Sequence, residues 1–133
     1  MSLIIHRNGD RPSRMAPAEY FTGTVLMTPI VQAPEPASLR ALSVTFAPGA
    51  RTNWHTHPLG QTLHVTSGQG LIALRDGAPE VIRAGDTVYI PPEVEHWHGA
   101  GPETAMTHIA MQEEPEAETT WLDPVSDADY AKS

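Results

Sequence analysis

The chain has 133 residues, with 8 Lys and Arg against 16 Asp and Glu, so its formal net charge is −8. This length suits one domain with one core, and the acidic balance disfavours nucleic acid and membrane as partners, whereas a small neutral organic substrate is compatible with it. Cysteine is absent, which excludes disulfides, thiolate metal sites and a cysteine nucleophile and fits a reducing compartment.

The composition, with 10 Gly, 13 Pro and 18% charged residues, is typical of a turn-rich β-protein. In chain order, alternating or β-branched runs predict strands over 2–6, 22–31, 39–46, 53–57, 61–67, 71–75, 80–83, 87–90, 96–99 and 104–112. The first of these is expected at a sheet edge. Many short strands at close spacing favour an all-β small barrel or jelly roll of two antiparallel sheets, and we expect a single domain over residues 1–133.

The segments between these strands carry turn signals. Turns are expected at 47–50, 67–70, 76–77 and 84–86. Residues 17–21 are expected to form a helical turn or a loop, and residues 113–133 an acidic C-terminal tail with a short helix within 123–132, capped at Ser126. The N-terminal residues show no signal peptide and no apolar stretch is as long as a membrane span, so we expect a cytoplasmic protein.

Two histidines, His55 and His57, are separated by one residue in a predicted strand, so their side chains point to the same side. Gln61 has the same parity just beyond a Pro-Leu-Gly turn, and His96 comes from a separate segment. Three imidazoles and an amide oxygen suit Mn, Fe, Ni, Co or Zn better than Ca or Mg. These four residues are therefore predicted to bind a divalent metal. A site that leaves coordination positions open is typical of catalysis.

The spacing of these residues resembles the first motif of the cupin superfamily: Gly, five residues, His-x-His, three or four residues, Glu, six residues, Gly. In this chain Gly49, His55, His57 and Gly68 stand at the matching positions, and Gln61 replaces the Glu. A neutral ligand leaves the ion its full dipositive charge, which favours Lewis-acid chemistry over redox chemistry.

The second cupin motif runs Gly, five residues, Pro-x-Gly, two residues, His, three residues, Asn. Gly85, Pro91 and His96 stand at the matching positions, whereas Glu93 replaces the Gly and Ala100 replaces the Asn. Two motifs in the correct order are a far more specific signal than a lone His-x-His. The resemblance implies a cupin barrel with its metal site.

The two metal-binding motifs lie within residues 49–100. The chain also resembles the bacterial cupin-type hydroxynitrile lyases in the stretches 20–25, 55–63, 96–100 and 106–113. That resemblance covers most of the chain and includes the glutamine ligand Gln61. It implies a small enzyme with Mn as the expected cofactor, which cleaves cyanohydrins to an aldehyde or ketone and HCN.

The implied reaction needs a base that takes the hydroxyl proton of the cyanohydrin. His108 is the expected base, because it shares a strand face with Met106 and Gln112 and because imidazole has a suitable pKa. The resemblance also implies catalytic roles for His98, Gln112 and Thr52. The apolar wall of the substrate pocket is expected to consist of Leu42, Val44, Phe46 and Met106.

Two other kinds of function remain open. One is a different cupin enzyme, such as a dioxygenase, which would more often keep Glu at position 61, or a sugar or uronate isomerase. The other is a cupin that binds a small ligand at its metal without catalysis. In each case we expect a homodimer to which residues 2–6 contribute an edge strand.

Overall fold

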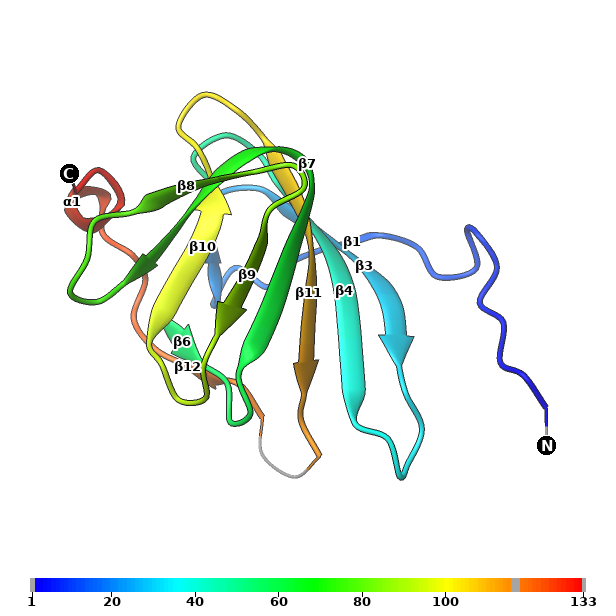
Figure 1. The fold of residues 1–133 in the computed structure, drawn as a ribbon. Coiled ribbons are helices and arrows are strands. Elements are labelled where there is room, and N and C mark those ends of the chain that lie inside the picture. The colour runs from blue at the N-terminus through cyan, green and yellow to red at the C-terminus, as the bar shows by residue number, and fades with distance from the viewer. Residues whose placement is uncertain (1, 116–117, 133) are drawn as a thin grey trace.

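The computed structural model describes residues 2–115 and 118–132, and its regular structure is almost entirely antiparallel β-sheet (Figure 1). The strands are β1 (Arg14–Met15), β2 (Phe21–Thr22), β3 (Val25–Gln32), β4 (Leu39–Phe46), β5 (Arg51–Thr52), β6 (His55–Thr56), β7 (Gln61–Leu74), β8 (Glu80–Arg83), β9 (Thr87–Ile90), β10 (His96–Ala100), β11 (Met106–Glu113) and β12 (Thr120–Trp121). A short helix, α1 (Asp127–Tyr130), follows the last strand.

The sheet curls into a half-barrel because one long strand belongs to both of its walls (Figure 1). The strand order is β1-β3-β4-β11-β7-β10-β5-β2. Strands β9 and β8 pair with the two halves of β7, and β6 lies between β10 and β12. This arrangement confirms the predicted all-β antiparallel architecture, and it turns alternate side chains of both walls toward one interior.

The strand β7 continues through residues 67–70, so the predicted turn there is wrong. Gly68 adopts a φ of +77°, and a Cβ at this position would collide with the carbonyl oxygen of Ala105. A Cβ at Gly70 would collide with the Met106 side chain. These glycines bend the strand without ending it, so β7 pairs with β9 and β11 before the bend and with β8 and β10 after it.

Two other predicted strands are divided. The segment 22–31 is interrupted at Gly23, whose φ is +83°, and so contributes to both β2 and β3. Within the segment 53–57, only β6 is a strand. The backbone changes partner here, because β5 pairs with β2 whereas β6 pairs with β10.

Two apolar clusters fill the interior. The larger one lies between the walls and contains Phe46, Leu63 and Val65, all fully buried. The smaller one contains Trp54 and Trp97 and lies beneath the C-terminal segment. The two tryptophans alternate with the histidines along the chain, and both are buried in this cluster.

The predicted edge strand over 2–6 does not form within the described chain. These residues run away from the barrel (Figure 1), and Leu3, Ile4 and Ile5 are exposed. The edge is formed instead by β1, which pairs with β3.

The C-terminal segment returns across the barrel. Its strand β12 pairs with β6, and this pairing was not predicted, because a two-residue strand carries no periodic signal. The predicted helix is confirmed as α1, where the Ser126 hydroxyl accepts a hydrogen bond from the backbone N–H of Asp129 at 3.1 Å.

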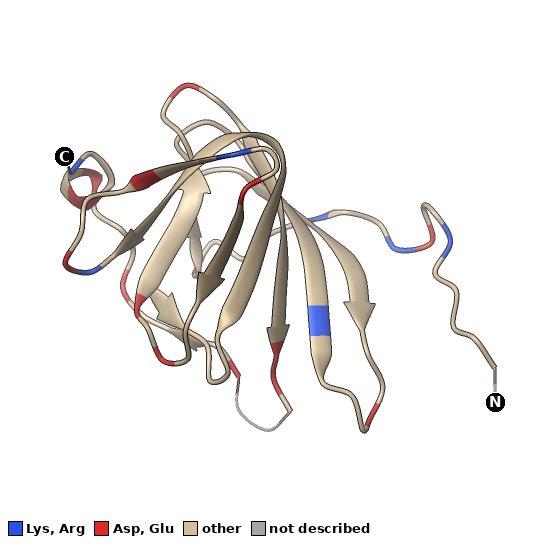
Figure 2. Cartoon of the chain, in the orientation of Figure 1, with Lys and Arg blue, Asp and Glu red and all other residues tan. Residues whose placement is uncertain are grey.

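Charged residues lie mainly in loops and near strand ends, with acidic and basic positions dispersed over the described residues (Figure 2). A membrane-spanning helix is not found in the part of the chain that the structure describes.

The bend in β7 makes a testable prediction. Replacing Gly68 with Ala should lower the free energy of unfolding by at least about 2 kcal/mol, because the new Cβ meets backbone at a left-handed φ. Gly77→Ala is the matched control, since nothing lies within 4 Å of a Cβ there. Urea denaturation would measure both, and equal stability of the two variants would contradict this account of the bend.

Candidate metal centre

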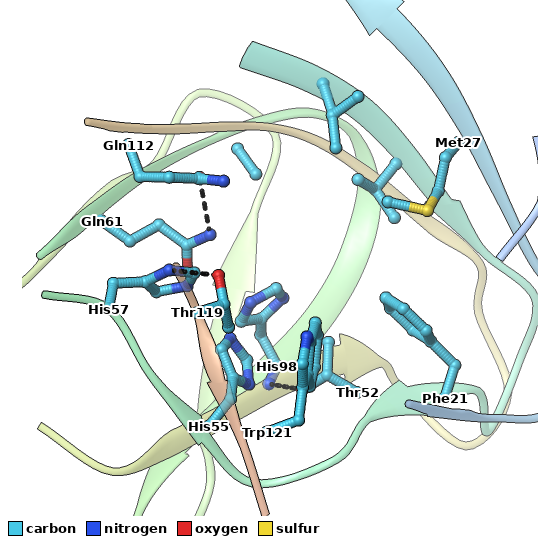
Figure 3. A pocket seen from close by; sticks show the side chains of 13 residues that line it. Phe21, Met27, Thr52, His55, His57, Gln61, His98, Gln112, Thr119 and Trp121 are labelled. Carbon is cyan, nitrogen blue, oxygen red and sulfur yellow. Dashed lines mark hydrogen bonds between the residues drawn. The ribbon is translucent and has the colours of Figure 1, made fainter. Parts of the chain in front are cut away.

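The pairing of β6 with β10 places His55 directly opposite His96. The two ring centroids are 4.2 Å apart, and both side chains are buried. His57 follows β6 and Gln61 begins β7, and both of these side chains are also buried. The structure therefore brings all four sequence-predicted ligands to one region of the barrel interior (Figure 3 shows three of them).

Two of these histidines have their tautomers fixed by the same local contact. Nδ1–H of His55 donates to the carbonyl oxygen of Asn53 at 2.9 Å, and Nδ1–H of His96 donates to that of Val94 at 2.9 Å. In each case the carbonyl belongs to the residue two positions earlier. A neutral imidazole that donates through Nδ1 keeps its lone pair on Nε2, which is the form that binds metals.

The tautomer of His57 is fixed by a side chain from the C-terminal segment. The hydroxyl of Thr119 donates to Oε1 of Glu114 at 2.8 Å, so its oxygen accepts from Nδ1–H of His57 at 3.0 Å. Although burial raises the pKa of Glu114, the nearby His57 ring and the hydrogen bond from Thr119 bring it down to about 2. Among the described residues, Nε2 of His57 is buried and has no hydrogen-bond partner.

The amide of Gln61 is oriented by Gln112. Its Nε2 donates to Oε1 of Gln112 at 3.1 Å, which leaves Oε1 of Gln61 at 3.2 Å from Nε2 of His96. Both of these atoms present lone pairs, because burial lowers the pKa of His96 to about 4 and Nδ1 holds the ring proton.

Two lone pairs that face each other in a buried site repel unless a cation lies between them. Ligand atoms at about 2.1 Å from one ion and at right angles to each other are about 3 Å apart. The separation between Gln61 and His96 therefore fits two ligands of one divalent metal.

His98 also belongs to this region. One nitrogen each from His55, His96 and His98 lies within 4.8 Å of the other two, so the structure contains a buried three-histidine group consistent with a metal site. This group shares two histidines with the predicted ligand set. It differs by including His98, which was predicted as catalytic, in place of His57.

His98 and His108 are joined by a hydrogen bond of 2.9 Å between Nδ1 of His98 and Nε2 of His108. Burial lowers the pKa of both rings, so the pair is neutral and shares one bridging proton. Nε2 of His98 has no hydrogen-bond partner among the described residues, and the backbone N–H of His98 donates to Oγ1 of Thr52 at 3.2 Å. His98 and Thr52 line the cavity, whereas His108, the expected base, lies behind His98.

The cavity beside these groups has a volume of about 70 Å³. Its polar end is formed by His55, His57, Gln61, Gln112 and Thr119, and Figure 3 shows these side chains together. Its apolar end is formed by Phe21, Met27, Leu42, Val44, Ala110 and Trp121. A pocket with one polar and one apolar end suits a small molecule that has both characters.

Two of the four residues predicted to form the apolar wall of the pocket line this cavity. Leu42 and Val44 line the cavity. Phe46 and Met106 do not line it, and their side chains are almost fully buried in the main core. Phe46 meets the rings of His98 and His108 edge-on instead. Strand alternation predicts which side of the sheet a side chain faces. It does not predict whether that side chain lies beside the cavity or deeper in the core, so Phe46 and Met106 were misplaced.

Five cavity residues were not predicted. One of them, Ala110, lies on β11 between His108 and Gln112. Phe21 and Met27 come from strands whose pattern carries no functional signal, and Thr119 and Trp121 come from the returning C-terminal segment. Trp121 stacks on Tyr20 with ring centroids 4.6 Å apart and lies 4.7 Å from the ring of His55. A tryptophan within an acidic tail is the one signal that could have pointed to a buried contact.

Known proteins resemble this chain at the level of family and fold. The cupin domain family matches residues 42–110. Over 131 residues, which are 98% of this chain and 100% of the relative, the sequence is 51% identical to the (R)-mandelonitrile lyase of Granulicella tundricola. The crystal structure of a cupin-like protein from Thermotoga maritima is 35% identical, with 96% of each chain covered and a TM-score of 0.86.

A more distant structure shows the fold alone. The polyketide cyclase RemF of Streptomyces resistomycificus is 20% identical, covers 98% of this chain and 91% of its own, and has a TM-score of 0.72.

The buried histidines predict a pH dependence of the metal-free protein. Burial lowers the pKa of His96 and of His108 from 6.5 to about 4. The unfolded chain therefore takes up these protons first as the pH falls, so stability that is present above pH 6.5 is lost between 6.5 and about 4. The expected loss is about 3 kcal/mol for each histidine.

Urea denaturation of the metal-free protein at a series of pH values would measure this loss. A free energy of unfolding that stays level across the window would contradict the burial of neutral imidazoles.

Proposed function

The chain belongs to the cupin family, and from this premise we propose that it is a metal-dependent hydroxynitrile lyase that cleaves a cyanohydrin to a carbonyl compound and HCN. The observation that carries the proposal is the 51% identity to a mandelonitrile lyase over 98% of the chain. The cavity supports it, because a buried cluster of neutral metal-ligand groups lies beside an apolar pocket.

The ligand set that we propose is Nε2 of His55, His57 and His96 together with Oε1 of Gln61. The support is that each of these atoms is left with a lone pair by the hydrogen bonds of its own side chain. A divalent ion held there would supply positive charge that favours loss of the substrate's hydroxyl proton. Mn is the proposed ion, and the same donors accept Fe, Ni, Co and Zn.

The proton acceptor that we propose is Nε2 of His98, which faces the cavity. In the tautomer that we propose, Nδ1–H of His98 donates to Nε2 of His108, so Nε2 of His98 carries a lone pair. As the hydroxyl proton moves to Nε2, the electron pair of the O–H bond forms the C=O bond and the pair of the C–CN bond leaves with cyanide. His98 then returns the proton to cyanide, which gives HCN and restores the neutral pair.

The remaining pocket residues orient the substrate. The oxygen of Thr52 accepts the backbone N–H of His98, which leaves its hydroxyl proton free to be donated to substrate. The apolar wall that includes Phe21, Val44 and Trp121 suits an aryl or alkyl group on the carbinol carbon. His108 stands behind His98 and positions its imidazole.

We propose that the chain over residues 1–133 acts as one domain and assembles as a homodimer. The exposed side chains of Leu3, Ile4 and Ile5 support a contribution of residues 2–6 to a second copy. The absence of cysteine supports a cytoplasmic location.

Cleavage of mandelonitrile by the Mn-loaded protein, followed as release of benzaldehyde, tests the function. We expect release above the spontaneous background, a return to background after chelation, and wild-type release from the exposed-site control Glu103→Gln. Release at background from protein with its metal bound would contradict the assignment.

The roles of the two histidines can be separated kinetically. His98→Asn removes the proton acceptor and should lower kcat by about 10²- to 10⁴-fold. His108→Phe keeps His98 but removes its partner, so it should lower kcat less and shift the pH–rate profile. A larger loss in His108→Phe than in His98→Asn would instead make His108 the base.

A further inference from the structure

Glu114 places a carboxylate next to the candidate metal centre, and only 2% of its side chain is exposed. Its two oxygens make separate contacts. Oε1 accepts from the hydroxyl of Thr119 at 2.8 Å, and Oε2 accepts from Nε2 of Gln112 at 3.3 Å. Thr119 and Gln112 are the residues that contact His57 and Gln61, so one carboxylate is connected to two of the proposed ligands.

The first connection decides which nitrogen of His57 carries the proton. A hydroxyl has one proton, and Thr119 gives it to Glu114, so its oxygen accepts Nδ1–H of His57. Without an acceptor at position 114, the hydroxyl could donate to Nδ1 instead. The ring proton would then sit on Nε2, and that nitrogen could no longer bind a metal.

The second connection decides which atom of Gln61 faces the centre. The carboxylate accepts only, so Gln112 must turn its NH₂ group toward Glu114 and its oxygen toward Gln61. That oxygen takes Nε2–H of Gln61 and leaves Oε1 of Gln61 directed at His96. A reversed amide would present N–H donors to the ion in place of an oxygen ligand.

The carboxylate also carries charge that the ligands lack. Three imidazoles and an amide are neutral, so a bound divalent ion has no anionic ligand among them. Arg40, on β4, lies 3.4 Å from Oε2 of Glu114 at the outer side of the carboxylate and holds it from that side.

We propose that Glu114 is a positioning residue that sets the ligand atoms of His57 and Gln61 together and stabilises the bound ion electrostatically through these contacts. Gln112, expected from the sequence to be catalytic, then acts as the amide that orients Gln61. This inference rests on the proposed ligand set, and its readout is metal binding, independent of lyase activity.

Titration of the metal-free protein with Mn²⁺ tests the proposal. Glu114→Gln keeps the shape of the side chain but removes one acceptor, and it should weaken Mn²⁺ binding by about 10- to 100-fold. The matched control is Glu113→Gln, the same change at the neighbouring exposed residue, whose carboxylate contacts Ser38. This control should bind Mn²⁺ with wild-type affinity.

The visible absorption of the Co²⁺-loaded protein adds a spectroscopic readout, because it reports the ligand atoms of the ion. The spectrum should change in Glu114→Gln and stay unchanged in Glu113→Gln. Thr119→Val cuts only the connection to His57 and should weaken Mn²⁺ binding less than Glu114→Gln does. Should Glu114→Gln fail to fold, a weaker affinity in Thr119→Val still supports the proposal.

Wild-type affinity and an unchanged Co²⁺ spectrum in Glu114→Gln would overturn the positioning role, as would wild-type affinity in Thr119→Val if Glu114→Gln does not fold. Wild-type protein that binds Mn²⁺ but leaves mandelonitrile intact would overturn the lyase function alone. The two failures are therefore distinguishable.

Discussion

The backbone register that sets His55 opposite His96 is the constraint on which the rest of the site depends. Both rings donate to the carbonyl two residues earlier, so strand geometry alone fixes their tautomers and directs Nε2 inward. Burial then keeps both rings neutral, because charged imidazoles would be costly in the barrel interior. The fold thereby brings imidazole lone pairs together in a buried group that is consistent with a metal site.

The other two proposed ligands depend on long-range contacts. His57 and Gln61 are oriented by Thr119 and Gln112, which lie more than fifty residues later in the chain. Both orienting residues meet at Glu114. The metal centre thus joins local strand geometry on one side to a hydrogen-bond network from the C-terminal half on the other. In the proposed ligand set, neutral donors beside a buried carboxylate would keep a bound divalent ion strongly electrophilic while its charge is partly balanced.

Sequence patterns predicted what depends on local periodicity and spacing. They gave the antiparallel barrel, the helix capped by Ser126, and the residues that the structure brings together around His55. They failed where tertiary contacts decide the outcome. Gly68 has the sequence signal of a turn but bends a continuous strand. Strand alternation predicted Phe46 in the pocket wall, whereas its side chain is enclosed by the core. No sequence motif around Thr119 indicates that its side chain contacts His57.

The most direct test of this account is a crystal structure of the Mn-loaded protein with an anomalous map measured at the Mn absorption edge. The account predicts one peak bound by Nε2 of His55, His57 and His96 and by Oε1 of Gln61, with His98 facing an open coordination position. A peak bound by His55, His96 and His98, with Gln61 turned away, would contradict it and would make His98 a ligand in place of the proton acceptor.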